Sequence, residues 1–462
     1  MVKIRLLKFY FLTILFFGCA STKTNLTQYK LSDKAFKKQD YTYAISRIKE
    51  AKDKYYKHKD RVLFYLDLGM LYHFNKQYKL SNQFLTNAEY VIEELFTKSI
   101  SKAGLSILLN DNAKEYQAED YEDIYINIFK ALNYIHLKMF DDAFVEINRV
   151  NHKLNMLEDK HRKIDNSYNK SKDKKIEFKT GKNRFYNDAL ARYISLLLYR
   201  ADGKWDNAEI DRKKIYEAFA LQSQLYTFSP PKMENILKPT TKVKTTFISF
   251  VGRSPVKQSK TLYIHTEKNV AIVATSKTKP IGEKDLTYLD AFFWYGLEDG
   301  YHFKFDIPQM IKSETNVANI MLVDSFSRTV FEPIEDIGDI ALETFKTRLS
   351  RIYIKTISRT ITKSLLAKKM SDKVEKNYGG VVGKLTSLAL SATSDATENA
   401  DLRVSRYFPQ KAFIAEVELE PGIHNLKVQY FNENERLIFT DYFPNISIKK
   451  NSLNIFESYY PR

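Results

Sequence analysis

Cysteine is nearly absent from this chain of 462 residues, which contains only one, Cys19. A single cysteine excludes an internal disulfide, a cluster of thiolate metal ligands and a redox-active cysteine pair. Histidine is also scarce, with 8 residues, and none of them lies in an HExxH motif or another paired-ligand spacing. We therefore expect each histidine to be an ordinary surface or core residue, and we predict no metal ion and no cofactor.

Motifs of several enzyme classes are missing as well. The segment YGGVVGKLT, residues 378–386, resembles a phosphate-binding loop, but the gap between its glycines is wrong and Leu385 replaces the required Ser or Thr. No Gly-x-Ser-x-Gly nucleophile elbow occurs. Carboxylates are abundant, yet abundance does not identify an acid–base pair without geometry. The sequence thus predicts no catalytic residues. An enzyme of cell-wall metabolism is an alternative, and its one support is the cell-envelope location that the N-terminus predicts.

Negative charge is in deficit, because 56 Asp and Glu face 73 Lys and Arg, for a net charge of +17. Such a charge is compatible with a nucleic-acid or anionic-membrane partner. The lysines are spread along the whole chain, which favours a general compositional bias over one binding patch. Hydrophobic residues make up 44% of the chain, an ordinary share for a globular protein of several domains.

The lone cysteine follows a signal-like N-terminus. Three basic residues within the first eight precede an apolar run at residues 9–17, and Gly18 and Cys19 follow it. This layout is typical of a secretory signal peptide, and the apolar run is too short to span a bilayer. A small residue directly before Cys is typical of bacterial lipoproteins. We predict a signal peptide over residues 1–18, cleaved between Gly18 and Cys19, and lipidation of Cys19 with acyl chains such as palmitate.

Two alternatives to the lipoprotein interpretation stay open, a plain signal peptide with a chance cysteine and an uncleaved anchor. No aspartate follows Cys19, where Ala20 stands, and in Gram-negative bacteria this favours the outer membrane. Residues 19–29 are polar and predict a tether. The expected location is the bacterial cell envelope, with the protein lipid-anchored in the outer membrane and facing the periplasm. A signal peptide also removes the chain from nucleic acid, so no nucleic-acid partner is predicted.

Residues 30–225 show apolar residues at three- and four-residue spacing, which indicates helices, and one pattern recurs four times. Each copy has an aromatic residue three positions before a small residue. These pairs are Tyr41 with Ala44, Tyr78 with Ser81, Phe140 with Ala143, and Trp205 with Ala208. Nine positions before the small residue lies another fixed position, occupied by Ala35, Tyr72, Tyr134 and Tyr199.

The pattern predicts stacked pairs of antiparallel helices. Small residues let two helices cross closely, aromatic residues fill the groove between units, and one unit cannot bury its own apolar face. The copies look like tetratricopeptide (TPR) repeats; a generic helical bundle is the alternative. The polar insertion at residues 158–182 predicts a loop between units.

Strand patterns begin after the proline-containing segment that ends the helices. Residues 240–338 contain β-branched and aromatic runs of period two and predict a β-rich domain. Residues 339–398 predict a long basic helix followed by a segment of small residues. Residues 399–462 return to strands, with Pro421–Gly422 as a hairpin turn, and complete the β domain as one sheet or sandwich. The predicted fold class is α+β.

Two sets of charged residues stand out in the C-terminal half. The first lies at four-residue spacing on the long helix and consists of Arg351, Lys355, Arg359 and Lys363. We interpret it as a solvated helix face; the alternative is a basic amphipathic helix on anionic lipid or peptidoglycan. The second is Asp401 with Arg403, which predicts an ion pair at the joint between helix and strand. The alternative for this pair is a recognition site at a domain junction.

Several of these segments together resemble an uncharacterised family of bacterial lipoproteins with tetratricopeptide-like repeats. The ALNY helix at residues 131–134 and the following helix with Ala143, Val145, Glu146 and Arg149 look like its most typical block. A Gly-x-x-Pro-x-Lys turn ending at Lys257, an AD-x-R segment ending at Arg403 and a hairpin with Pro421, Gly422 and His424 are similar to its β region. The resemblance covers nearly the whole chain after the signal and implies fold and location, but no reaction.

The sequence thus predicts a lipid-anchored envelope protein that binds other envelope proteins in the concave groove of its repeats. The main alternative is a structural or assembly component. It would form homo-oligomers, or contact the membrane or peptidoglycan, through residues 339–398.

Overall fold

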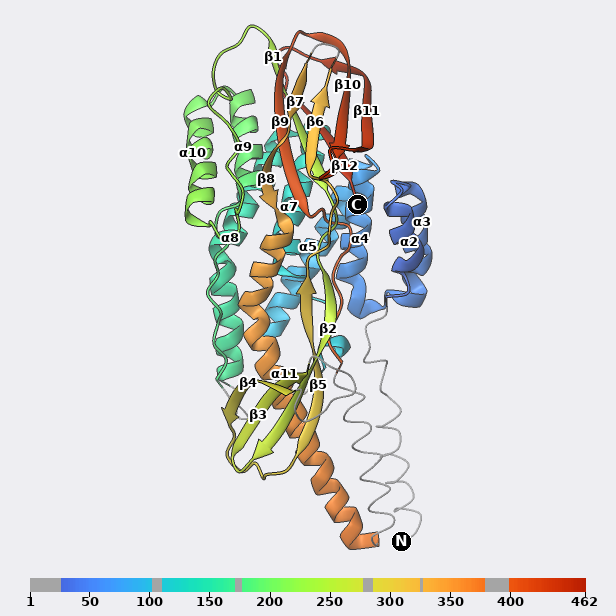
Figure 1. The fold of residues 1–462 in the computed structure, drawn as a ribbon, viewed down its shortest axis with the longest axis vertical. Helices are drawn as coiled ribbons and strands as arrows, with labels where there is room; N and C mark the ends of the chain where they lie inside the picture. Colours follow the sequence, from blue (N-terminus) through green and yellow to red (C-terminus); the bar gives the residue numbers. More distant parts are fainter. Residues whose placement is uncertain (1–25, 102–109, 171–176, 277–285, 325–326, 379–398) are drawn as a thin grey trace.

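The computed structural model describes residues 26–101, 110–170, 177–276, 286–324, 327–378 and 399–462, and its fold class is α+β (Figure 1). The predicted cleavage and lipidation residues, Gly18 and Cys19, and the small-residue segment 379–398 lie outside the described residues. The helices of the N-terminal half are α2 (Tyr29–Phe36), α3 (Tyr41–Tyr55), α4 (Arg61–Phe74), α5 (Tyr78–Ser101), α7 (Asp120–His136), α8 (Phe140–Asn169), α9 (Ala189–Ala201) and α10 (Trp205–Leu221). Two short 3₁₀ helices, η1 (His58–Asp60) and η2 (Asp111–Ala113), lie between them.

The same tight turn joins the helices of four hairpins, α2/α3, α4/α5, α7/α8 and α9/α10. Its central residue has a left-handed backbone, and these residues are Gln39 (φ 61°), Lys76 (φ 59°), Lys138 (φ 61°) and Gly203 (φ 72°). The next N–H donates to a carbonyl five residues back, at 2.9–3.0 Å, and the acceptors are Ala35, Tyr72, Tyr134 and Tyr199. This closure satisfies carbonyls that a helix end leaves open. The turn therefore accounts for the nine-residue spacing in the sequence.

The small residues of the repeat pattern, Ala44, Ser81, Ala143 and Ala208, are fully buried. Tyr78 stacks on His136 of the next hairpin, with ring centroids 4.4 Å apart. The ring centroids of Tyr41 and of Phe74 in the next hairpin are 6.0 Å apart. Phe140 is half-buried against the core. Trp205 does not have the predicted packing role, because its side chain is 52% exposed. It stands on the last of the four hairpins, so no fifth hairpin of the described array covers it.

A second difference concerns the insertion predicted as a loop over residues 158–182. Helix α8 continues through this region to Asn169. Its polar segment still has an apolar stripe, in which Ile164 and Tyr168 are buried beside Phe178. The polar composition hid this stripe from the sequence pattern.

The strands form three four-stranded sheets. The first has the order β12-β1-β9-β8, the second β11-β10-β6-β7 and the third β4-β3-β2-β5. Their bounds are β1 (Val243–Val251), β2 (Val256–Glu267), β3 (Val270–Ser276), β4 (Leu286–Phe293), β5 (His302–Ile311), β6 (Asn319–Val323), β7 (Arg328–Val330), β8 (Glu332–Asp336), β9 (Lys411–Leu419), β10 (Gly422–Phe431), β11 (Leu437–Ile448) and β12 (Asn454–Tyr460). Strands β1 and β12 are parallel, and the other neighbours in the three sheets are antiparallel.

The C-terminal strands complete the first two sheets, which pack face to face as a sandwich. The predicted hairpin at Pro421–Gly422 is wrong in one respect, because β9 and β10 do not pair with each other. Strand β9 pairs with β1 and β8, whereas β10 pairs with β11 and β6. The turn is therefore a corner at which the chain crosses from one sheet to the other. Apolar residues of both sheets, including Phe247 and Val428, are buried between them.

The first sheet lies between the second sheet and the helices. Along β1, Phe247 faces the second sheet, whereas Ile248 and Phe250 belong to the core shared with the helices. Alternate residues of a strand point to opposite faces, so both faces of β1 are apolar. The helical array and the first sheet consequently share one continuous core, and they are not packed as separate domains.

This arrangement covers the inner face of the helical hairpins. Phe74 of α4 stacks on Tyr459 of β12 with ring centroids 4.0 Å apart. His73 and His136 both contact Glu457 of the same strand. One face of α4 and α7 is therefore covered by strand β12 of the chain's own first sheet.

The long helix α11 (Ile337–Tyr378) connects the two β regions. It begins directly after β8, runs beside α7 and α8 and passes the third sheet (Figure 1). Ile337 and Phe345 join the core of the helical array, whereas Ile357 and Ile361 join the core of the third sheet. None of the described helices combines the length and the apolar character that crossing a bilayer needs.

Candidate functional site

A cavity of about 460 Å³ lies where the helical array, α11 and the third sheet meet. We call it the junction cavity. Its lining comes from α5, the segment from η2 to Glu119, the end of α8, strands β2 and β5, helix α11 and residues 399–403. The charged side chains of the lining are Lys98, Lys114, Lys257, Arg348, Arg351, Lys355, Arg359, Arg403, Asp111, Glu115, Glu119, Asp306 and Asp401. Eight of these side chains are basic and five are acidic, and Asp60 and Asp165 pair with Arg403 and Arg351 from outside the lining.

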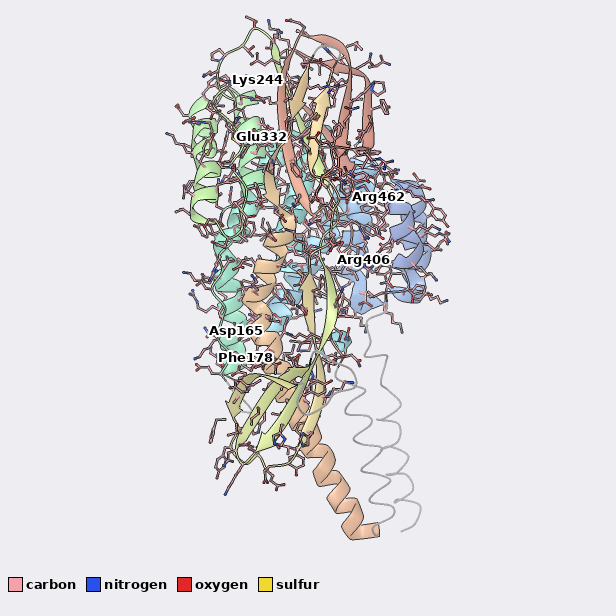
Figure 2. The ribbon with its side chains drawn as sticks, viewed as in Figure 1. Asp165, Phe178, Lys244, Glu332, Arg406 and Arg462 are labelled. Atoms are coloured by element: carbon pink, nitrogen blue, oxygen red, sulfur yellow. The ribbon has the colours of Figure 1, made fainter. Side chains whose placement is uncertain are left out.

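Helix α11 supplies four of the basic residues at three- and four-residue spacing, which places them on one face of the helix. Both interpretations of this face, solvated or lipid-bound, are wrong for Lys355 and Arg359, whose side chains are buried. Arg351 donates from Nε to Asp165 of α8 at 2.5 Å, and Lys355 pairs with Asp111. Figure 2 labels Asp165 on α8 beside α11. The described basic face points into the protein because acidic residues there pair with it.

Two carboxylates of the cavity are each shared by two cations. Glu119 accepts from Lys257 of β2 at 2.5 Å and from Arg348 of α11 at 3.1 Å. Asp111 pairs with Lys355 and also lies 3.7 Å from Lys114 Nζ. A carboxylate carries one negative charge, so Glu119 shared by Lys257 and Arg348 leaves local positive charge beside the cavity.

Arg403 closes one wall of the cavity. It makes two hydrogen bonds to Asp401, at 2.8 and 2.9 Å, so the ion pair expected from the sequence is present. It also donates to Asp60 at 2.9 Å and to the backbone carbonyls of Asp111 and Lys114 at 2.8 and 3.0 Å. Burial would raise the pKa of Asp401, but Arg403 lowers it below the usual value. The pair therefore fixes the position of the segment that carries Asp111 and Lys114.

Lys114 is the basic residue whose environment disfavours its charge most clearly. Burial, together with the nearby charge of Lys355, lowers the pKa of Lys114 to about 6. A buried ammonium next to another cation is destabilised unless negative charge compensates it. The carboxylate of Asp111, 3.7 Å from Lys114 Nζ, offsets this effect in part, and an anion bound in the cavity would raise the pKa of Lys114 further.

Part of this site was visible in the sequence. Arg351, Lys355, Arg359, Asp401 and Arg403 were singled out in two separate segments, and the structure brings them to one cavity. No sequence pattern pointed to Lys114, Asp111, Glu119 or Arg348. Their positions depend on contacts between segments more than 200 residues apart, such as Arg348 with Glu119. Lys257, the last residue of the Gly-x-x-Pro-x-Lys turn, also belongs to the lining.

The arrangement is suited to holding an oxyanion. Arginine and lysine side chains donate charge-assisted hydrogen bonds to phosphate and carboxylate groups. Among the described residues, no group of three or more His, Cys, Asp and Glu side chains is placed to hold a metal ion. No family model, curated protein or solved structure matches the chain.

Proposed function

We propose that the protein is a lipid-anchored protein of the bacterial cell envelope that binds an anionic group of an envelope ligand in the junction cavity. The observation that supports the binding function most strongly is the cavity itself, which is lined by eight basic side chains, four of which share two carboxylates. The four helical hairpins, each closed by the same left-handed turn, support tetratricopeptide-like repeats. In this proposal the inner face of the hairpins packs against the first sheet. The ligand binds in the junction cavity and not in the groove of the repeats.

The role of α11 in this proposal differs from the assembly alternative. Its basic residues from Arg348 to Arg359 line the cavity, and Arg351 and Lys355 pair with acidic residues of the helical array. A surface for membrane or peptidoglycan contact would need these charges on the outside. Homo-oligomerisation through residues 339–398 would have to use the part of that segment beyond the cavity.

Inorganic phosphate is the first probe, titrated into the purified protein at constant ionic strength and followed by calorimetry and thermal unfolding. We expect saturable binding and a rise in the melting temperature with phosphate. Lys114→Gln should abolish most of this response. It should leave the free protein at least as stable near pH 7, because Lys114, with a pKa of about 6, must lose its proton on folding at that pH and the variant removes this cost.

Lys213→Gln is the matched control, because the Lys213 side chain on α10 is 72% exposed and α10 does not line the cavity. It should respond to phosphate as the wild type does. An unchanged response in Lys114→Gln, or an equal response to chloride, would contradict the proposal. The anchor is tested separately by labelling with palmitate, which should be incorporated in the wild type and not in Cys19→Ser.

A further inference from the structure

Two histidines from distant parts of the sequence face each other on the third sheet. His265 of β2 and His302 of β5 lie directly opposite in an antiparallel pair of strands. Their Nδ1 atoms are 3.4 Å apart, and their ring centroids are 4.5 Å apart. The neighbours Ile264 and Phe303 pack in the core against α11. Because side chains alternate along a strand, the two histidines lie on the opposite, solvent-facing side of the sheet.

The separation of the two nitrogens matches the distance between two nitrogen ligands of one metal ion. A Zn–N bond measures about 2.0–2.1 Å, so two nitrogen ligands of a tetrahedral zinc ion lie about 3.4 Å apart. The observed distance between the Nδ1 atoms is 3.4 Å. Strand pairing on a sheet also holds the two Cβ atoms at a fixed spacing, so binding would require rotation of the two rings, which lie 30° from parallel, and no movement of the strands.

We propose that His265 and His302 form a solvent-exposed binding site for a divalent transition metal, in which both Nδ1 atoms are ligands. Neutral imidazole is a good ligand for zinc, copper and nickel. Without metal, the two rings can share one hydrogen bond between their Nδ1 atoms; when the metal binds both Nδ1 atoms, the ring that donated carries its proton on Nε2 instead. The protein supplies two ligands, and water or a donor atom of another molecule completes the coordination.

Two side chains of opposite charge flank the histidine pair on the same face of the sheet. Glu267 lies two residues beyond His265 on the same face of β2, and Lys304 lies two residues beyond His302 on the same face of β5. A carboxylate and an ammonium on this face oppose each other in their effect on a bound cation. The two imidazoles therefore dominate the affinity, which follows the order in which imidazole sites prefer divalent metals, with Cu²⁺ bound more tightly than Ni²⁺ or Zn²⁺.

The test is a titration of the untagged, full-length protein with Cu²⁺ and Zn²⁺, followed by calorimetry, and electron paramagnetic resonance of the Cu²⁺ form. We expect one metal per chain, a copper spectrum with nitrogen ligands, and a loss of affinity of at least tenfold in either His265→Ala or His302→Ala. His424→Ala is the matched control, because His424 is an exposed strand histidine that contacts the carbonyl of Glu420 and no other histidine. It should bind as the wild type does.

Two outcomes would overturn the site. One is the absence of saturable binding by the wild type. The other is binding of unchanged affinity in both histidine variants, with circular dichroism showing that they are folded. Neither outcome affects the phosphate experiment, because the histidine pair and the junction cavity share no residue.

Discussion

Asp67 is a fully buried carboxyl that joins three parts of the chain. It accepts hydrogen bonds from Tyr29 and Tyr56 at 2.8 Å and from Ser405 at 2.9 Å. Burial raises the pKa of Asp67 to about 7, although these hydrogen bonds lower it. The carboxyl thus connects α2, α4 and the segment before β9 while its charged form is disfavoured near neutral pH.

The first prediction concerns the pH dependence that Asp67 causes. In the unfolded chain its pKa has an ordinary value near 4, so between about pH 4 and pH 7 the folded state binds more protons. The contribution of Asp67 to stability therefore rises as the pH falls through 7. We expect the stability of the wild type relative to Asp67→Asn to increase from about pH 8 to about pH 5, measured by urea unfolding. An equal difference at both pH values would contradict this account.

At the scale of an element, the crossing of α4 and α5 depends on one glycine. A Cβ atom on Gly69 would lie 2.5 Å from Leu85 Cδ2 and 2.7 Å from Leu85 Cγ. Ser81 of α5 also donates to the Gly69 carbonyl at 2.8 Å. Both contacts require the helix backbones to approach closely, which is the purpose of the small residues in the repeat pattern.

The second prediction is that Gly69→Ala destabilises the protein by about 1–3 kcal/mol, because the added methyl group overpacks the crossing. Adding Leu85→Ala removes the atoms that it would meet. The double variant should therefore lose less stability than the sum of the two single changes. Denaturant unfolding of all four proteins measures this coupling, and strictly additive losses would contradict the proposed clash.

The β elements show why pairing across the sheets decides where side chains meet. His265 and His302 are separated by β3 and β4 along the chain, yet β2 and β5 are neighbours in the sheet. A sequence search for metal ligands a few residues apart does not connect these two histidines. Likewise, Pro421–Gly422 has the composition of a hairpin turn, but the strands on its two sides belong to different sheets.

For the whole molecule, the shared core predicts that helices and first sheet unfold together. Tyr459 of β12 stacks on Phe74 of α4 and donates to the carbonyl of Gly252 at 2.8 Å. Its side chain is buried between the array and the sheet. Removing it would open a cavity on the boundary between the two parts.

The third prediction is that Tyr459→Ala lowers the free energy of unfolding by about 3–5 kcal/mol, as large-to-small changes of core aromatics do. The loss should be the same by the helical signal in far-ultraviolet circular dichroism as by the near-ultraviolet signal of the packed aromatic side chains, because coincident transitions are expected for one cooperative unit. Tyr442→Ala is the control, because Tyr442 of β11 is 64% exposed and should change stability by less than about 0.5 kcal/mol. A helical signal that melts independently in Tyr459→Ala would contradict the shared core.

The sequence alone determined the features that depend on neighbouring residues. The helical hairpins, the buried small residues such as Ser81, the long helix and the ion pair of Asp401 with Arg403 follow from spacing over a few helical turns or a few residues. Helix periodicity and turn chemistry are local properties, so the sequence pattern carries them directly.

Only the tertiary structure decided which of these parts face one another. The inner face of the hairpins is apolar in the sequence whether a partner or the chain's own β12 covers it. The basic stripe of α11 has the same spacing on a solvated face as in the junction cavity, and it is buried because Asp111 and Asp165 stand opposite. Such contacts join residues far apart in the chain, and their formation depends on the packing of whole elements rather than on any local pattern.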